Sequence, residues 1–200
     1  MKNKDAHSLN SEICNRIKQL RMKKGWSQDQ LSEKAGFTKS YLSQIENHKK
    51  EPPISTLNKI AYALGLDVLE LITGQKSEAE HKPFTLVRAD ERRSIAPPSA
   101  LPTVQYESIS FKRAKRLMDG YVLTLGFEFP KETNVHGGEE LVFVLEGETE
   151  FFYDGKIYTI KAGDAYYFDS NRPHHSRSIG DVPAKLLVVF ATKGAINQGE

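Results

Sequence analysis

Residues 27–46 read SQDQLSEKAGFTKSYLSQIE, and this stretch predicts two short helices joined by a tight turn. Ser27 is a favourable N-terminal cap, and Gln30 follows three residues later, which is the spacing of a capping box. Gly36 and Phe37 indicate a short turn, after which Thr38 can cap the next helix. Two helices joined by a three- to four-residue turn that contains glycine form a helix-turn-helix motif.

The residues on either side of this motif keep a helical pattern. Ile13 and Ile17 recur at a helical step in a segment expected to be helical from Ser11 onwards. Beyond a Pro-Pro loop, which no helix can continue through, two further helices are expected over residues 55–65 and 67–72. Residues 11–74 are therefore predicted to form an all-α domain of five helices, preceded by a polar tail over residues 1–10.

The composition is that of a water-soluble chain, with a mean hydropathy of -0.51 and 27% charged residues. The longest apolar run, over residues 186–191, is far too short to span a bilayer, and the N-terminus lacks the apolar core of a signal peptide. Cys14 is the single cysteine and sits in a helical pattern, so no internal disulfide can form. We expect a cytoplasmic protein with no membrane partner, and Cys14 as a small core residue.

Charge is distributed unevenly along the chain. Residues 1–76 carry 13 Lys and Arg against 8 Asp and Glu, a net charge of +5, whereas the remaining 124 residues carry 15 against 18, a net charge of −3. A basic first part joined to a mildly acidic second part indicates that only the first part meets a polyanion such as DNA.

The hydrophobic period changes after a polar stretch at residues 75–83, which is expected to be a linker. Short segments rich in Val, Tyr, Phe and Leu follow, separated by glycine and proline turns such as Asp154-Gly155. Many short strands at regular spacing predict an antiparallel sandwich or barrel over residues 84–192, followed by a C-terminal tail over residues 193–200.

The helical part resembles the phage-repressor-type (XRE-like) helix-turn-helix family, through SQDQLSEKAGFTKSYLSQIE together with PPISTLNKIAYALGL. The resemblance covers all five expected helices and implies a salt bridge between Arg21 and Glu46. It also implies double-stranded DNA as a partner, with the second helix of the motif in the major groove. A helical bundle that has lost DNA binding and serves protein interaction is the alternative, which the polar and basic recognition positions disfavour.

The candidate DNA contacts fall into two groups. Thr38, Lys39 and Ser40 open the recognition helix, where base edges are reached, and Gln44 lies on the same face as Ser40. Gln28, at the start of the preceding helix, can donate to a phosphate. The remaining candidates for phosphate contacts are Ser43, Asn47, Lys49 and Lys50.

The stretch from Val122 to Phe190 resembles the cupin family, whose double-stranded β-helix barrels carry two short motifs. The positions of the first motif, H-x-H-x3-E-x6-G, hold Asn134, His136, Glu140 and Gly147. The second motif ends in P-H-x3-N, and its positions hold Pro173, His174 and Ser178. The resemblance thus implies three metal ligands, His136, Glu140 and His174, with asparagine in place of the first histidine.

Residues 134, 136 and 140 are separated by even steps and face the same side of an extended chain, with Val142 and Val144 continuing that face. Two imidazoles and one carboxylate are a set that binds Fe(II) with open positions. Two alternatives stay open. In one, the site holds one divalent metal (iron, manganese or zinc), with Asn134 or water as a fourth ligand. In the other, the same residues hydrogen-bond to one another or to an organic ligand.

The remaining candidate pocket residues come from a basic run and two aromatic side chains. In FKRAKR, residues 111–116, Arg113 and Arg116 could hold an anionic ligand at the barrel mouth, and a solvated turn is the alternative. Tyr166 and Phe168 are expected in the pocket wall. His175 has an odd offset from His174, so we expect it to point away from the pocket and lie at the surface.

Taken together, the two resemblances predict a non-enzymatic, sequence-specific transcriptional regulator. Its cupin barrel would sense a small-molecule effector, and the chain would pair with itself as a homodimer through the cupin domain. The alternative is a cupin-type non-haem Fe(II) oxygenase or epoxidase, since hydroxypropylphosphonate epoxidase resembles this chain in layout. The DNA-reading face favours the regulator, because an enzyme has no need for it.

Overall fold

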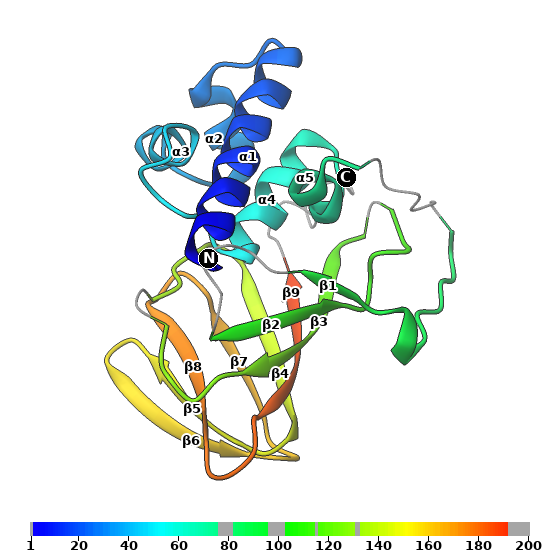
Figure 1. Cartoon of the computed structure of the whole chain (residues 1–200), viewed down its shortest axis with the longest axis vertical. Coiled ribbons are helices and arrows are strands. Elements are labelled where there is room, and N and C mark those ends of the chain that lie inside the picture. Colours follow the sequence, from blue (N-terminus) through cyan, green and yellow to red (C-terminus); the bar gives the residue numbers. More distant parts are fainter. Residues whose placement is uncertain (1, 76–81, 96–102, 115, 131–132, 192–200) are drawn as a thin grey trace, which may run out of the picture. The chain divides into compact units, whose positions relative to one another are not determined.

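The computed structural model describes residues 2–75, 82–95, 103–114, 116–130 and 133–191, and for residues 2–9 it describes the backbone only. The described residues form two compact units, a helical one before residue 76 and a strand-rich one from Lys82 onwards (Figure 1). Most of the predicted linker at 75–83 and the predicted C-terminal tail at 193–200 lie outside the described residues.

The helical unit contains α1 (Lys2–Lys23), α2 (Gln28–Ala35), α3 (Lys39–Glu46), α4 (Ile54–Leu64) and α5 (Val68–Thr73). All five predicted helices are present. The predicted start of the first helix at Ser11 is wrong, because the helix begins at Lys2 and the expected tail over residues 1–10 is helical from that residue on. The fourth helix also begins slightly earlier than expected, at Ile54, with Pro53 as its N-cap.

The caps that the sequence predicts fix the ends of α2 and α3. The hydroxyl of Ser27 accepts a hydrogen bond from the backbone N–H of Gln30, and the Gln30 side chain accepts one from the backbone N–H of Ser27. The hydroxyl of Thr38 accepts a hydrogen bond from the backbone N–H of Tyr41. Gly36 ends α2 in a left-handed conformation with φ 71°, which suits a residue without a β-carbon.

The core of the helical unit lies between the helices and includes the predicted Ile13, Cys14 and Ile17. Its fully or almost fully buried side chains include Ile13, Cys14, Ile17, Leu31, Ala35, Leu42, Ile45, Leu57 and Ile60. Tyr41 and Trp26 are only half-buried. The Trp26 ring instead lies against the ammonium groups of Lys24 and Lys34, each 5.1 Å from its centroid.

A buried ion pair ties α1 to the end of α3. The Arg21 guanidinium donates two hydrogen bonds to the Glu46 carboxylate, from Nε at 2.6 Å and from Nη2 at 2.9 Å. The Glu46 side chain is fully buried and that of Arg21 nearly so. A two-bond contact of this kind fixes both distance and orientation, so the predicted salt bridge is confirmed and sets the position of the third helix.

The second unit consists of short strands, with a single 3-10 turn, η1 (Ala89–Glu91), before the first of them in the described residues. The strands are β1 (Arg93–Ile95), β2 (Val104–Ser108), β3 (Met118–Leu125), β4 (Glu139–Glu146), β5 (Glu148–Tyr153), β6 (Lys156–Lys161), β7 (Ala165–Asp169), β8 (His174–Ile179) and β9 (Lys185–Ala191).

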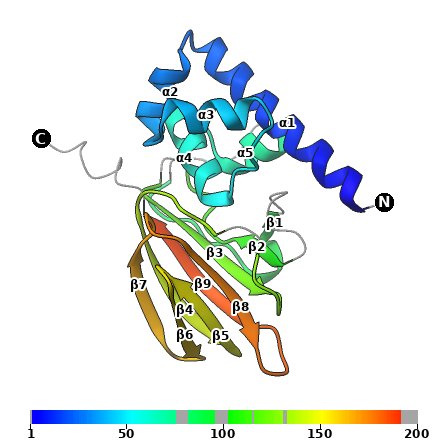
Figure 2. The same cartoon turned by 90° about the vertical axis from the view of Figure 1, so that its left-hand side faces the viewer.

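Within the described residues these strands form two antiparallel sheets, seen together in Figure 2. The larger sheet has the order β1-β2-β3-β9-β4-β7, and the smaller has the order β6-β5-β8. Their inner faces pack on one another, since the Phe151 ring on β5 lies 4.9 Å from the Phe168 ring on β7. This arrangement confirms the predicted barrel-like domain.

Strand β4 shows how the alternation of the sequence sets the two faces of the larger sheet. Val142 and Val144 are buried in the interior, as predicted from their even spacing to Glu140. The intervening side chains, Leu141, Phe143 and Leu145, point outwards and are partly exposed. The inner face of β4 therefore begins with Glu140 and continues with apolar side chains, which places the carboxylate at one end of the barrel interior.

Candidate functional site

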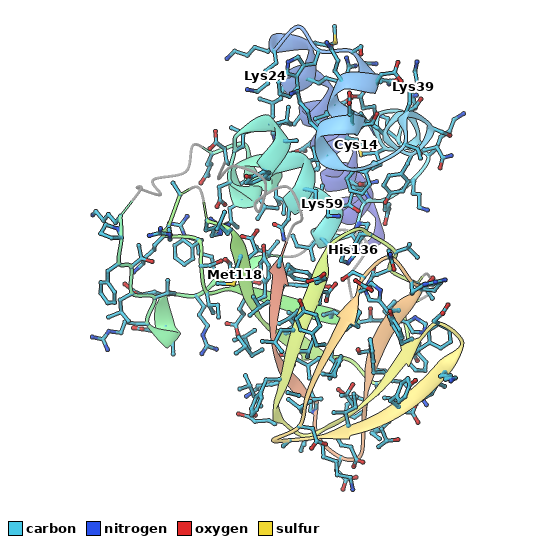
Figure 3. The ribbon with its side chains drawn as sticks, turned by 180° about the vertical axis from the view of Figure 1, so that it is seen from behind. Cys14, Lys24, Lys39, Lys59, Met118 and His136 are labelled. Atoms are coloured by element: carbon cyan, nitrogen blue, oxygen red, sulfur yellow. The ribbon has the colours of Figure 1, made fainter. Side chains whose placement is uncertain are left out.

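The first candidate site is the exposed surface of α3. Thr38, Lys39, Ser40 and Gln44 are all exposed, and they lie at the N-terminal end and along one side of this helix. Lys39, labelled in Figure 3, forms an ion pair with Asp29 of α2 at 2.7 Å. The helix thus presents short polar side chains and an amide to solvent, which are the groups that read base edges in a major groove.

The residues after α3 add polar and cationic groups to the same end of the unit. Asn47, Lys49 and Lys50 are exposed, and Ser43 is half-buried. The Asn47 side chain donates a hydrogen bond to the Ser43 carbonyl at 2.8 Å, which closes the end of the helix. The Lys50 ammonium lies 5.1 Å from the centroid of the Tyr41 ring. These contacts hold the cationic segment against the helix without burying its charges.

Gln28 has a structural contact that the sequence did not reveal. Its side-chain amide donates a hydrogen bond of 2.8 Å to the Glu46 carboxylate, the same group that Arg21 holds. Gln28 therefore links the start of α2 to the end of α3. The sequence showed only that Gln28 begins a helix, which is a position suited to a phosphate contact. It did not show the hydrogen bond to Glu46, because the two residues are eighteen positions apart in the chain.

The second candidate site is the cluster of His136, Glu140 and His174 at the end of the barrel interior, where Figure 3 labels His136. His136 lies just before β4, Glu140 is on β4 and His174 opens β8. The Nε2 atom of His136 lies 2.9 Å from Oε1 of Glu140, and the Nε2 atom of His174 lies 3.5 Å from the same oxygen. All three side chains are buried, with at most 7% of each exposed.

Backbone carbonyls set the orientation of the two imidazole rings. The Nδ1 atom of His174 lies 2.8 Å from the carbonyl oxygen of Arg172, and the Nδ1 atom of His136 lies 3.3 Å from that of Gly137. A carbonyl can only accept, so these contacts assign a proton to each Nδ1 and turn each Nε2 towards Glu140, where it donates a hydrogen bond while the ring is protonated and offers a lone pair once that proton leaves. Such carbonyl partners on the far nitrogen are usual for histidines that bind metals.

The carboxyl group of Glu140 is ionised inside the barrel. Burial opposes its ionisation, but the hydrogen bonds and charges of His136 and His174 outweigh burial, and the pKa of Glu140 falls to about 2. The hydroxyl of Ser170 donates a further hydrogen bond to Oε1 of Glu140 at 3.0 Å. Two imidazole nitrogens and one carboxylate oxygen therefore lie within 4.8 Å of one another, and this set of atoms can bind a cation when the two rings are neutral.

Aromatic side chains surround the cluster. The ring of Phe168 lies 5.0 Å from that of His174, and the ring of Phe190 lies 6.1 Å from that of His136. Tyr166 stacks against Phe168 at 5.9 Å, so the two predicted wall residues on β7 lie side by side. Burial, together with the charge of Glu140, raises the pKa of the Tyr166 hydroxyl, which therefore remains protonated and able to donate.

Two residues of the site were missed by the sequence reasoning. Ser170 contacts Glu140 directly, and Tyr106 on β2 is buried in the interior, where burial and the charge of Glu140 raise the pKa of its hydroxyl. Ser170 stands four residues before His174, near the second cupin motif, which is the signal that could have revealed it. Tyr106 enters the barrel through the pairing of β2 with β3, which no local pattern shows.

Asn134 lies beside the cluster, opposite His174. The two residues form an antiparallel bridge, in which the Asn134 N–H donates to the His174 carbonyl at 2.8 Å and the reverse bond measures 3.0 Å. Directly opposed residues of an antiparallel pair place their side chains on the same side. The Asn134 side chain is therefore on the side of the chain from which His174 enters the cluster.

The two arginines of the FKRAKR run already have hydrogen-bond partners within the strand-rich unit. The Arg113 guanidinium donates to the backbone carbonyl of Lys82. The Arg116 guanidinium donates to the Asp119 carboxylate on β3 and to the Arg113 carbonyl, and both charged side chains of the Arg116–Asp119 pair are largely buried. Both arginines thus have protein partners other than the cluster, whereas Phe168 contacts His174 and Tyr166 stacks on Phe168.

His175 points away from the cluster, as expected, but the prediction that it lies at the surface is wrong. It is half-buried on the outer face of the smaller sheet, where its ring stacks on Phe129 at 4.4 Å and meets Phe152 at 5.0 Å. Burial lowers the pKa of this imidazole. The odd offset from His174 predicted the correct face of the strand. The burial was not predicted, because the aromatic rings that cover His175 come from residues distant in the chain.

Comparisons with known proteins agree with the two units of the fold. A helix-turn-helix family model matches residues 17–71 and a cupin domain model matches residues 126–190. The HTH-type transcriptional regulator PuuR of Escherichia coli (strain K12) is 29% identical over 165 residues, which cover 80% of this chain and 83% of the relative. The two units thus define a DNA-binding regulator with a barrel domain. The chain belongs to the helix-turn-helix transcriptional regulators that carry a cupin domain.

One solved structure of a transcriptional regulator shares the fold. The crystal structure of an HTH_3 family transcriptional regulator from Vibrio cholerae matches 94% of this chain and 98% of its own, with 24% identity and a TM-score of 0.59. Hydroxypropylphosphonic acid epoxidase from S. wedmorenis matches with 21% identity, over 90% of this chain and 97% of its own, at a TM-score of 0.47, too low to support any inference. No helix within the described residues has the length and apolar character that crossing a membrane requires.

Proposed function

We propose that the cupin domain of this regulator binds a small-molecule effector at the His136–Glu140–His174 cluster, and that this binding changes the affinity of the chain for DNA. The observation that carries the proposal is the convergence of two imidazole nitrogens on one buried carboxylate oxygen, at 2.9 and 3.5 Å. A buried charged group of this kind is costly to maintain, and such groups concentrate at binding and catalytic sites.

The donor set fits one divalent metal ion. His136, Glu140 and His174 would hold it through two nitrogens and one oxygen, a set that suits iron, manganese or zinc and leaves positions open. The carbonyls of Gly137 and Arg172 already orient the two imidazoles for that role. The ion would act as a Lewis acid that attracts an effector group carrying a lone pair. Ser170 holds the carboxylate of Glu140 in place.

The barrel residues around the cluster would select the effector. Phe168, Phe190 and Phe151 offer apolar ring surface, while the protonated hydroxyls of Tyr106 and Tyr166 can donate hydrogen bonds. A pocket of mostly apolar walls with a few directed polar groups is typical of small-molecule sites. Arg113 and Arg116 would contribute to an anion site at the barrel mouth only if they released their present hydrogen bonds to Lys82 and Asp119 and bound the anion instead.

The helical unit would read DNA through α3. Thr38, Lys39, Ser40 and Gln44 would reach base edges, because they are exposed at the start and along one side of this helix. Gln28, Ser43, Asn47, Lys49 and Lys50 would contact phosphates. The Arg21–Glu46 pair supports this arrangement, since it fixes the end of α3 against α1.

Two chains would act together on DNA. A homodimer that pairs through the cupin strands would place two recognition helices about one helical turn apart, on the order of 34 Å. Effector binding in the barrel would shift the populations of two dimer arrangements, of which only one matches both half-sites. The short polar segment at residues 75–83, which separates the two units in the sequence, motivates this coupling.

The cluster also supports a second candidate function, a cupin-type Fe(II) oxygenase, because two histidines and one carboxylate with open positions are the ligand set of such enzymes. The exposed polar surface of α3 favours the regulator. Consumption of O2 by the iron-loaded chain above that of a Glu140→Gln variant, in the presence of a candidate substrate, would support the enzyme.

A cation titration tests the proposed site directly. The purified full-length chain, stripped with a chelator, is titrated with Fe2+, Mn2+ or Zn2+ by calorimetry, and one ion per chain is expected. The control is His175→Ala, which removes the neighbouring imidazole that points away from the cluster and should leave cation binding unchanged. Absence of binding in the wild type, or equal binding in Glu140→Gln, would refute the metal site.

A further inference from the structure

An ion pair joins the first turns of α2 and α3 at the surface of the helical unit. The Nζ atom of Lys39 lies 2.7 Å from Oδ2 of Asp29, and the two side chains are 60% and 62% exposed. Asp29 is the second residue of α2, and Lys39 is the first residue of α3. Figure 2 shows these two helices side by side. The contact, called the Asp29–Lys39 pair below, therefore connects the start of the candidate recognition helix to the helix before it.

The stability of α3 gives no reason for a lysine at position 39. The N-terminal end of a helix carries a partial positive charge, so a cation in the first turn is unfavourable there. No acidic residue lies in the first turn of α3 to offset this charge. Asp29 does so from α2, but an ion pair as exposed as this one contributes no more than about 1 kcal/mol. The position of Lys39 thus fits a role in binding better than a role in folding.

The two side chains offer complementary hydrogen-bonding groups. The ammonium of Lys39 has three N–H donors and no acceptor, whereas the carboxylate of Asp29 can only accept. In the major groove, a G·C pair presents two adjacent acceptors, guanine N7 and O6, followed by the N4 amino donor of cytosine. One ammonium beside one carboxylate matches that order. An A·T pair presents an acceptor, a donor, an acceptor and a methyl group, so at least one of these hydrogen bonds would not form.

We propose that the Asp29–Lys39 pair reads one G·C base pair of the operator. Lys39 donates to N7 and O6 of the guanine with two of its N–H groups and keeps the third on Oδ2 of Asp29, the contact already present. Oδ1 of Asp29 accepts from N4 of the cytosine. The inference rests on the proposed reading of DNA by α3 and deepens it, because it names a base pair and adds a residue of α2 to the side chains that determine specificity.

The charge of Asp29 strengthens discrimination between DNA sequences. A carboxylate on a surface that meets DNA repels phosphates and so weakens binding to every sequence. On a G·C pair, the hydrogen bond from cytosine N4 offsets that repulsion, whereas other pairs at this position offer less compensation. Specificity is a difference between two affinities, and a group that penalises the wrong partner increases that difference. Asp29 therefore lowers the affinity for random DNA more than the affinity for the operator.

A selection experiment identifies the base pair. The full-length chain, either loaded with Zn2+ or stripped by chelator, selects fragments from a pool of random double-stranded oligonucleotides. Fluorescence anisotropy then gives the dissociation constants for the selected site and for its single-pair variants. We expect one G·C pair whose replacement by A·T weakens wild-type binding by about tenfold or more. In Lys39→Ala the same replacement should have almost no effect, because the ammonium that distinguishes the two pairs is absent.

Asp29→Ala tests the part of the carboxylate. The preference for G·C over A·T at the same pair should fall by about fivefold, the effect of one hydrogen bond. Binding to random DNA should become tighter, and its salt slope should steepen by about 0.9, because Lys39 is released to contact one more phosphate. The matched control is Glu33→Ala, which removes the same charge from another exposed position of α2 and should leave the base preferences unchanged. Melting temperatures close to that of the wild type show that the variants are folded.

The outcomes separate this inference from the proposed function. If the wild type selects a sequence but Lys39→Ala retains every base preference, or loses a preference for A·T, the inference is wrong and DNA reading by the helical unit stands. If Asp29→Ala tightens binding to all sequences equally, the carboxylate only repels phosphates, and the inference is again wrong. If the wild type enriches no sequence in either the loaded or the stripped form, the proposed function itself fails.

Discussion

The Nε2 atom of His136 lies 2.9 Å from Oε1 of Glu140, four residues later in the chain, and His174 brings a second Nε2 atom to within 3.5 Å of the same oxygen. Each imidazole has its other nitrogen next to a backbone carbonyl. The rings therefore turn their Nε2 atoms towards a negatively charged carboxylate, and two neutral rings would both point a lone pair at that charge. A proton on one of the rings or a metal ion between them resolves this repulsion, and the site has the donors for a metal.

Removing one of these donors should weaken cation binding strongly. Glu140→Gln keeps the shape of the side chain and loses its charge, so the affinity for Zn2+ or Mn2+ should fall more than the roughly 10- to 100-fold loss that outer-shell changes cause. Ser170→Ala, which removes only the hydrogen bond to Glu140, should fall within that smaller range. Calorimetric titration measures both, and an unchanged affinity in Glu140→Gln would contradict the assignment of the ligands.

Restoring the usual first histidine of the cupin motif should have the opposite effect. Asn134 faces the same side as His174 across an antiparallel bridge, so Asn134→His should add a fourth ligand, the third nitrogen of the set, and raise zinc affinity by about tenfold or more. The same titration checks this expectation. Asn134→Ala serves as the control. An equal gain in zinc affinity in this variant would show that the asparagine side chain obstructs the site and that the new histidine is not a ligand.

How much of this architecture the sequence foretold depends on whether the deciding contacts are local. Ser27, Thr38 and Gly36 act within one helical turn, so the ends of α2 and α3 were predictable from their neighbours. The alternation along β4 gave the inward Val142 and the outward Phe143 for the same reason. The start of α1 at Lys2 was missed because residues 2–10 are mostly polar and show little of the apolar repeat on which the prediction relied.

The residues of the site that belong to a sequence motif could be predicted. Those that contact the site from distant strands could not. His136, Glu140 and His174 stand at motif positions, and the structure brings them together. Ser170, Tyr106 and the link from Gln28 to Glu46 depend on pairing between segments far apart in the chain. The aromatic cover over His175 is of the same kind. The alternation of residues along a strand predicts on which face of the sheet a side chain lies. Only the tertiary fold shows which other residues cover that side chain.

Breaking the buried ion pair between Arg21 and Glu46 should destabilise the helical unit. Arg21→Ala leaves a fully buried carboxylate without its main partner, and the free energy of unfolding should fall by about 3 kcal/mol or more. Urea denaturation followed by the fluorescence of Trp26, the single tryptophan, reports this unit. Lys39→Ala, which removes the exposed pair with Asp29, should cost no more than about 1 kcal/mol. Equal effects of the two variants would count against the proposed support of α3.

Residues that read bases should differ from residues that hold phosphates in their response to sequence and salt. Gln44→Ala should cost about 1–3 kcal/mol on a specific site and little on random DNA, whereas Lys49→Ala should weaken both and reduce the salt slope by about one. Fluorescence anisotropy on a fragment upstream of the chain's own gene, against random DNA, separates the two. Lys156→Ala, on an exposed strand of the cupin unit, is the control, and loss of binding there would place the DNA on another surface.

The central claim is that occupancy of the cupin cluster sets the affinity of the helix-turn-helix unit for DNA. The most direct test is an anisotropy titration of the full-length chain on that upstream fragment, with the chain either loaded with divalent metal or stripped by chelator. We predict that the two dissociation constants differ by about fivefold or more, the lower range of measured couplings between sites, and that the difference disappears in Glu140→Gln. Identical affinities for the loaded and stripped wild type, or a difference that persists in Glu140→Gln, would contradict the account.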